Sequence, residues 1–167
     1  MKKVLALVLT LVMVMSFAAC GGGGSDLASG ELKLTVPEGF AEQTDVPEGI
    51  SKYWLAEDGS NINMSQTDSD PSVKNAKEDQ LLSMVKDQME QVFGQDVEAE
   101  MVYFEGGEFL GTPGYSMSIK YNVAGIEFTQ YQVMAATTDG TYAWTMTDMT
   151  GDYGDTFKAM IDSAVIE

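Results

Sequence analysis

Few residue types in this 167-residue chain could support catalysis or bind a transition metal. The sequence has no histidine, and Cys20 is its one cysteine. These absences exclude Ser-His-Asp and Cys-His catalytic sites, and zinc sites built from His and Cys. Carboxylates remain, but with 26 acidic residues close pairs arise by chance. We therefore expect a protein that is not an enzyme and needs no cofactor. The alternative is a carboxylate-based hydrolase acting on cell-wall or extracellular material.

Two acidic loops could bind calcium, which prefers oxygen ligands. One loop contains Asp68 and Asp70, and the other contains Asp148, Asp152 and Asp155. Neither has the spacing or the terminal glutamate of an EF-hand. We favour the interpretation that both are solvated acidic loops, the second with a helix cap. We assign no metal site, and a weak calcium site is the alternative.

Four aromatic residues could stack on a sugar or a peptide: Trp54, Tyr131, Tyr142 and Trp144. Aromatic side chains on strands more often belong to the core or to cross-strand pairs. We therefore expect these four to be core residues and leave the ligand-binding residues unassigned.

The charge of the chain limits its partners. The nine basic residues are all lysines, and the formal net charge is −17. Nucleic acid is a poor partner, because binding it requires clustered Lys and Arg. Anionic lipid is disfavoured for the same reason. A protein or a neutral glycan fits this charge better.

Residues 1–19 have the three-part layout of a secretory signal peptide. Lys2 and Lys3 precede the apolar run 4–15, and small residues follow it. The run is shorter than the roughly 20 residues of a membrane span, although a membrane-anchoring helix is the alternative interpretation. The segment predicts export.

Cys20 lies directly after this segment, and the residues Phe17-Ala18-Ala19-Cys20 resemble the lipobox of bacterial lipoproteins. The resemblance implies cleavage before Cys20 and attachment of a diacylglyceryl group, with fatty acids such as palmitate, to its thiol. Phe17 departs from the Leu, Val or Ile that is usual there. Ordinary cleavage after Ala18, which would release a soluble protein, is the alternative. We expect contact with the membrane through the lipid anchor only, on the extracytoplasmic side.

Residues 20–30 are rich in glycine and serine, which predicts a flexible tether after the lipidated cysteine. The remainder, residues 31–167, shows no second linker. We interpret it as a single domain.

The pattern of this domain is that of an α+β protein. Alternating apolar residues predict strands over 31–36, 50–56 and 61–66, with a hairpin turn at Asp58-Gly59. A helix is expected from about Val73 or Lys77 to Phe93, ended by Gly94.

Four strand-like runs follow the helix, and three of them are joined by short turns. They cover residues 97–104, 114–123, 126–136 and 141–147, which predicts an antiparallel meander. A last helix is expected over about 155–165. The order predicts an antiparallel sheet flanked by helices.

This layout resembles the Mog1/PsbP-like fold, an α/β/α sandwich found also in related bacterial lipoproteins. The resemblance rests on the opening residues Leu32 to Phe40, the meander from Gly114 to Trp144, and the closing helix from Phe157 to Ser163. It implies an accessory or binding protein, and it carries over no catalytic residues.

Overall fold

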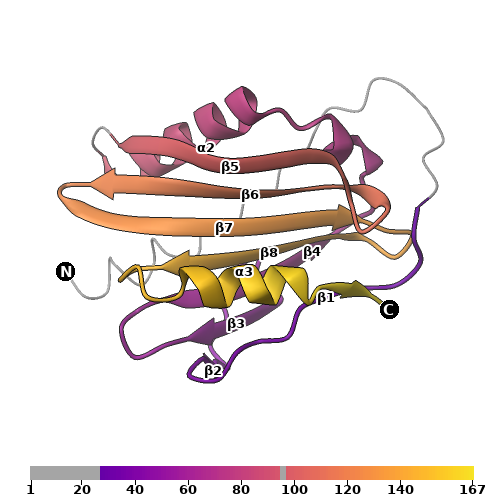
Figure 1. The fold of residues 1–167 in the computed structure, drawn as a ribbon, viewed down its shortest axis with the longest axis horizontal. Helices are drawn as coiled ribbons and strands as arrows, with labels where there is room; N and C mark the ends of the chain where they lie inside the picture. The colour runs from indigo at the N-terminus through magenta and orange to yellow at the C-terminus, as the bar shows by residue number, and fades with distance from the viewer. Residues whose placement is uncertain (1–26, 95–96) are drawn as a thin grey trace.

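The computed structural model describes residues 27–94 and 97–167. The predicted signal peptide, Phe17, Cys20 and most of the predicted tether lie outside the described residues. Within them, one seven-stranded antiparallel sheet forms the centre of the molecule (Figure 1). Its strand order is β2-β3-β4-β8-β7-β6-β5.

The seven strands come from a hairpin and a meander that meet side by side. The bounds are β2 Ala41–Glu42, β3 Lys52–Leu55, β4 Asn61–Thr67, β5 Glu98–Phe109, β6 Thr112–Val123, β7 Ile126–Ala136 and β8 Thr141–Asp148. The hairpin joins the meander where β4 pairs with β8, from Asn61 opposite Thr147 to Thr67 opposite Thr141. This pairing places the first and last thirds of the domain in one sheet.

A second, two-stranded sheet pairs the two ends of the described chain. Its strands are β1 (Leu32–Lys33) and β9 (Val165–Ile166), which run antiparallel. The backbone N–H groups of Glu31 and Glu167 each donate to the other residue's carbonyl. The start and the end of the domain are therefore fixed together.

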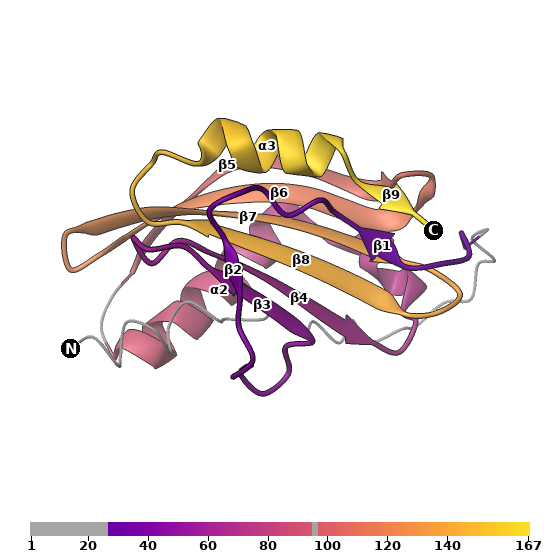
Figure 2. The same ribbon diagram turned by 90° about the horizontal axis from the view of Figure 1, so that it is seen from below.

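Helices lie on both faces of the main sheet, as Figure 2 shows. The 3-10 helix η1 (Pro71–Asn75) and the helix α2 (Glu78–Phe93) cover one face, and α3 (Gly154–Asp162) lies on the other. Leu81, Val85 and Met89 of α2 are buried, whereas Phe157 and Met160 are the buried residues of α3. The sheet therefore separates two hydrophobic cores.

Because successive side chains of a strand point to opposite faces, each face of the sheet contributes residues to one of the two cores. Along β6, the core beneath α2 receives Tyr115, Met117, Ile119, Tyr121 and Val123. The other core combines Trp144 and Met146 of β8 with Leu32, Phe40 and Phe157. The central strands β7 and β8 are buried over most of their length because they contribute to both cores.

The predicted order of hairpin, helix, meander and helix is confirmed, and so is the α+β class. Gly94 has the left-handed φ of 67° that ends α2. Three local predictions were wrong. The strand predicted to stop at Phe104 continues through Gly106 and Gly107, because both pair with β6. The last helix ends at Asp162 and β9 follows it, while the opening strand has only two residues.

The described end of the predicted tether is held by the domain. The backbone N–H of Ala28 donates to Oγ1 of Thr112 at 3.3 Å. The N–H of Gly30 donates to Oδ2 of Asp139 at 2.8 Å, and its carbonyl accepts from Thr137 Oγ1 at 2.6 Å. Residues 28 and 30, which were expected to belong to the tether, are thus hydrogen-bonded to Thr112 and to the β7–β8 turn.

Candidate functional site

A groove of about 420 Å³ lies on the α3 side of the sheet, between that helix and the edge strand β5. Figure 1 shows α3 lying over the face of the sheet whose residues line this groove. The lining residues come from three neighbouring strands and from one side of the helix: Val102, Tyr103, Ser116, Met117, Ser118, Tyr131, Lys158, Ile161 and Asp162. We call this feature the groove.

The floor of the groove follows from the alternation along β6. Tyr115, Met117 and Ile119 are buried in the core beneath α2, so Ser116 and Ser118 between them point toward the α3 side. Serine side chains are short. They leave open the space that larger residues at these positions would fill.

Ser116 and Ser118 are the most informative residues of the groove. Their exposed fractions are 8% and 5%, so both are more than nine-tenths buried. Within the described part of the chain, no hydrogen bond uses either hydroxyl. Neither hydroxyl oxygen is among the fully buried unpaired polar atoms of the described residues, so both are open to the groove and can form hydrogen bonds there. Two hydroxyls at the floor of an otherwise largely apolar groove are therefore suited to a bound group.

The wall formed by β5 contains an irregularity. The pairing of β5 with β6 shifts between Met101 and Tyr103, so Val102 is an extra residue in a β-bulge. Val102 is 61% exposed and Tyr103 is 47% exposed. The bulge thus presents two large side chains at the rim of the groove.

Tyr103 is held in place by a neighbour on its own strand. Its hydroxyl donates to Oε2 of Glu105 at 2.5 Å. This hydrogen bond, followed by burial and by the charges of Glu105 and Asp162, raises the pKa of Tyr103 above its usual value of 10. Tyr103 is therefore neutral at physiological pH, and its ring forms an apolar edge.

The opposite wall comes from α3. Lys158, Ile161 and Asp162 line the groove, while Phe157 and Met160 of the same helix pack into the core. Tyr131 of β7 lies between helix and floor, with its ring 5.8 Å from that of Phe157 in an edge contact. Burial, and then the charges of Asp148 and Asp155, raise the pKa of Tyr131.

A second, smaller hollow of about 170 Å³ lies further along the same strands, toward the β6–β7 turn. We call it the acidic pocket. Its lining residues are Glu98, Ala99, Glu100, Lys120, Tyr121, Asn122 and Glu127.

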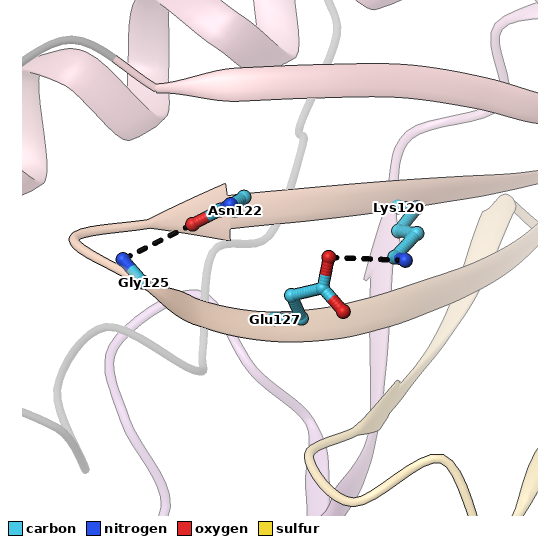
Figure 3. A network of polar contacts seen from close by, with 4 residues as sticks. All are labelled: Lys120, Asn122, Gly125 and Glu127. Atoms are coloured by element: carbon cyan, nitrogen blue, oxygen red, sulfur yellow. Dashed lines mark hydrogen bonds and ion pairs between the residues drawn. The ribbon is translucent and has the colours of Figure 1, made fainter.

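The acidic pocket contains one cation and three carboxylates. Nζ of Lys120 lies 3.1 Å from Oε1 of Glu127, as Figure 3 shows. In the same view, Oδ1 of Asn122 accepts a hydrogen bond from the backbone N–H of Gly125 at 3.1 Å, which closes the turn. Glu98 and Glu100 lie opposite Asn122 and Lys120 on β5.

Neither acidic loop gathers its carboxylates into a site. Among residues 27–94 and 97–167, no group of three or more Asp, Glu, Cys or His side chains could hold a metal ion. Asp68 is exposed, and Oδ1 of Asp70 accepts from the backbone N–H and the hydroxyl of Ser72 at the start of η1.

In the loop after β8, Asp148 is the acidic residue that accepts the most hydrogen bonds. Asp148 is 1% exposed and accepts hydrogen bonds from the backbone N–H groups of Thr150, Gly151 and Tyr153, at 3.2, 2.7 and 3.0 Å. Asp152 is exposed, and Asp155 lies in the first turn of α3, whose N-cap is Tyr153. The helix cap expected in this loop was therefore wrong, because neither Asp155 nor Thr156 is the N-cap residue and no side chain caps α3.

All four aromatic residues that were expected in the core lie in or against it. Trp144 and Tyr142 are buried, and Trp54 stacks on Trp144 with ring centroids 5.5 Å apart. Tyr131 packs against the same core and also lines the groove. Sequence reasoning missed the other groove residues. The one available signal was the pair of small serines within the strict alternation of β6.

No helix in the described part of the chain is both long and apolar enough to cross a membrane. Comparisons of sequence give no relatives: no protein-family model matches the chain, and no curated protein does. Comparison with solved structures, in contrast, finds proteins of similar fold.

Cyanobacterial PsbP (CyanoP) from Synechocystis is similar with a TM-score of 0.61 over 90% of this chain and 98% of that one, at 13% identity. The fold is PsbP/Mog1-like. The Ran-binding protein Mog1p of Saccharomyces cerevisiae agrees, with a TM-score of 0.53 over 81% of this chain and 89% of that one, at 9% identity. At these identities the PsbP/Mog1-like likeness concerns the fold.

Proposed function

We propose that this protein is a lipid-anchored binding or accessory protein on the extracytoplasmic side of the cell membrane, and that it binds its partner in the groove. The observation that carries the binding role is the pair of serines at the floor of the groove, Ser116 and Ser118, whose hydroxyls are open to the groove and make no hydrogen bond within the described chain. They lie in a groove whose lining is mostly apolar, with Lys158 and Asp162 as charged residues of the α3 wall, and small binding sites share this combination.

The likeness to Mog1p gives this proposal some support. That protein is described as Ran-binding, so the fold can present a surface for another protein. The composition of the groove supports a role without catalysis. Asp162 is the one carboxylate among the lining residues, whereas glycoside hydrolysis needs two that flank the scissile bond. We therefore prefer a binding role for the groove over the hydrolase alternative.

The anchor is tested by replacing Cys20. Each buried methylene contributes about 0.8 kcal/mol to membrane binding, so two or three acyl chains hold a protein stably. We expect the mature wild-type chain to enter the detergent phase of a phase-separating detergent, and Cys20→Ser to stay in the aqueous phase. The same distribution for both proteins would exclude lipid attachment at Cys20.

Phe17→Leu tests the departure from the usual lipobox. If Phe17 slows processing, Phe17→Leu increases the lipidated fraction of the exported chain. An unchanged fraction would show that the peptidase accepts phenylalanine at this position.

The groove is tested with a photo-crosslinking residue at position 102, introduced into the full chain and activated in the cell envelope. We expect a discrete crosslinked product from this position. The matched control is position 38, because Glu38 is also exposed but does not line the groove. Equal crosslinking from both positions would contradict a specific role for the groove.

A further inference from the structure

The groove and the acidic pocket lie on one face of the sheet, and their spacing is that of neighbouring side chains on a strand. Ser118 lines the groove, and Lys120, two residues further along β6, lines the acidic pocket. Residues i and i+2 of a strand point to the same face about 6.8 Å apart. An extended chain lying along β6 would place every second side chain at this spacing.

The two hollows differ in chemistry. The groove is bounded mainly by Val102, Tyr103 and Ile161, with the two serine hydroxyls at its floor. Its α3 wall also contains one cation and one carboxylate, Lys158 and Asp162. The acidic pocket has Glu98 and Glu100 on one side and the Lys120–Glu127 ion pair on the other. Within the described residues, neither Glu98 nor Glu100 forms an ion pair. The first hollow therefore suits an apolar side chain and the second suits a cation.

We propose that the partner is an extended segment of another protein that places an apolar side chain in the groove and a Lys or Arg side chain, two positions away, in the acidic pocket. This inference rests on the proposed use of the groove for binding. The hydroxyls of Ser116 and Ser118 would then hydrogen-bond to the backbone of the bound segment.

Charge complementarity decides between this occupant and others. The strand β5 contains Glu98, Glu100, Glu105 and Glu108 and no basic residue. A second copy of this edge, an acidic peptide or an anionic lipid surface would bring like charges together. A neutral glycan would leave Glu98 and Glu100 without a counter-charge. A segment with one apolar and one basic side chain fits the groove and the acidic pocket at once.

The test uses the Cys20→Ser chain and capped octapeptides, with binding followed by NMR. The probe peptide has Leu and Lys two positions apart, between Ser, Thr and Gly. One control peptide has Glu in place of Lys, and another has Leu and Lys three positions apart. We expect the probe to bind at least tenfold more tightly than either control and to shift the signals of Val102, Ser118 and Lys120.

Substitutions in β5 test whether the lysine of the bound peptide lies in the acidic pocket. Glu98→Gln with Glu100→Gln should weaken binding of the Lys peptide about fivefold, because exposed ion pairs contribute modestly. The matched control is Glu108→Gln, which changes the same strand outside the pocket and should leave binding unchanged. Adding salt should weaken binding of the Lys peptide more than binding of a peptide with norleucine at that position.

The outcomes separate this inference from the proposed function. If the Lys and Glu peptides bind the groove equally, or if Glu108→Gln weakens binding as much as the paired substitution, the basic partner is excluded but the groove remains a binding site. The same holds if a neutral oligosaccharide shifts the groove signals and the peptides do not. If no peptide, oligosaccharide or anionic vesicle shifts these signals, both proposals are overturned.

Discussion

The indole Nε1 of Trp144 donates a hydrogen bond of 2.9 Å to the backbone carbonyl of Leu32. Trp144 belongs to β8 at the centre of the main sheet, whereas Leu32 belongs to β1 of the small sheet. Both residues are buried in the core beneath α3. One side chain therefore links the two sheets, and through β1 it also links the chain's start to its end.

Replacing Trp144 should weaken the contact between the two sheets. Trp144→Phe removes the donor, leaves the Leu32 carbonyl buried without its partner and opens a small cavity. We expect a loss of about 2 kcal/mol in the free energy of unfolding, measured by urea denaturation. Trp54→Phe is the matched control, because Trp54 is only partly buried and stacks on the same ring. Equal losses in both variants would contradict a special role for the hydrogen bond.

Asp148 should stabilise the folded protein and should not bind calcium. Its oxygens accept three backbone N–H groups, so Asp148→Asn replaces one acceptor with a donor that meets other donors. We expect a loss of about 2 kcal/mol, whereas Asp152→Asn, at an exposed position, should change stability by less than about 0.5 kcal/mol.

Millimolar calcium should leave the melting temperature of the wild-type chain unchanged, because the oxygens of Asp148 are already occupied. A calcium-dependent rise in melting temperature that is lost in Asp148→Asn would show that the loop binds the ion.

Gly114 should not tolerate a side chain. A Cβ at this position would collide with the carbonyl oxygen of Met134 on the neighbouring strand and with Phe109. We expect Gly114→Ala to destabilise the protein by about 3 kcal/mol, measured by thermal unfolding. Gly106→Ala is the control, because its Cβ meets mainly the ring of Phe104, which is only half-buried and can move. The reverse order of the two losses would contradict the close approach of β6 and β7.

Stability should fall at alkaline pH because of two buried tyrosines. Burial raises the pKa values of Tyr115 and Tyr121 well above 10. Above pH 10 the unfolded chain releases these protons and the folded chain retains them. The stabilisation is therefore complete below pH 10 and declines as pH rises toward the folded-state values, by about 1.4 kcal/mol per pH unit for each tyrosine.

Tyr121→Phe checks this dependence. The hydroxyl of Tyr121 lies 3.4 Å from Gln130 Oε1, a long hydrogen bond, so the variant should be nearly as stable as wild type at pH 7. Urea unfolding at pH 7 to 11 should show a shallower decline than in wild type. An unchanged slope would mean that Tyr121 ionises in the folded state.

The sequence predicted the meander well because its signals are local. Strict alternation from Gly114 to Val123 and the turns at Ala124-Gly125 and Asp139-Gly140 define three neighbouring strands, and the structure confirms them. Gly106 and Gly107 have the composition of a turn but lie in a strand. Their pairing with Tyr115 and Gly114 is a tertiary relationship that single-sequence patterns do not contain.

The groove could not have been predicted for a similar reason. Ser116 and Ser118 have the polar alternation of a solvent-facing strand surface, yet both are buried. Their burial results from α3, whose position over the sheet depends on Phe157 and Met160, and from the bulge at Val102. The junction at the middle of the main sheet could not be predicted either, because the pairing of β4 with β8 joins residues about 80 positions apart.

The hydrogen bonds of Ala28 and Gly30 also determine which end of the domain lies closer to Cys20. They lie by Thr112, where β6 begins, whereas the acidic pocket lies near the other end of β6, about 27 to 34 Å away at about 3.4 Å per residue. The seven residues from Cys20 to Leu27 span at most about 25 Å. A lipid on Cys20 would keep Thr112 close to the bilayer, and repulsion between anionic headgroups and Glu98, Glu100 and Glu127 would turn the β6–β7 hairpin outward. Partners would then approach from the side opposite the membrane.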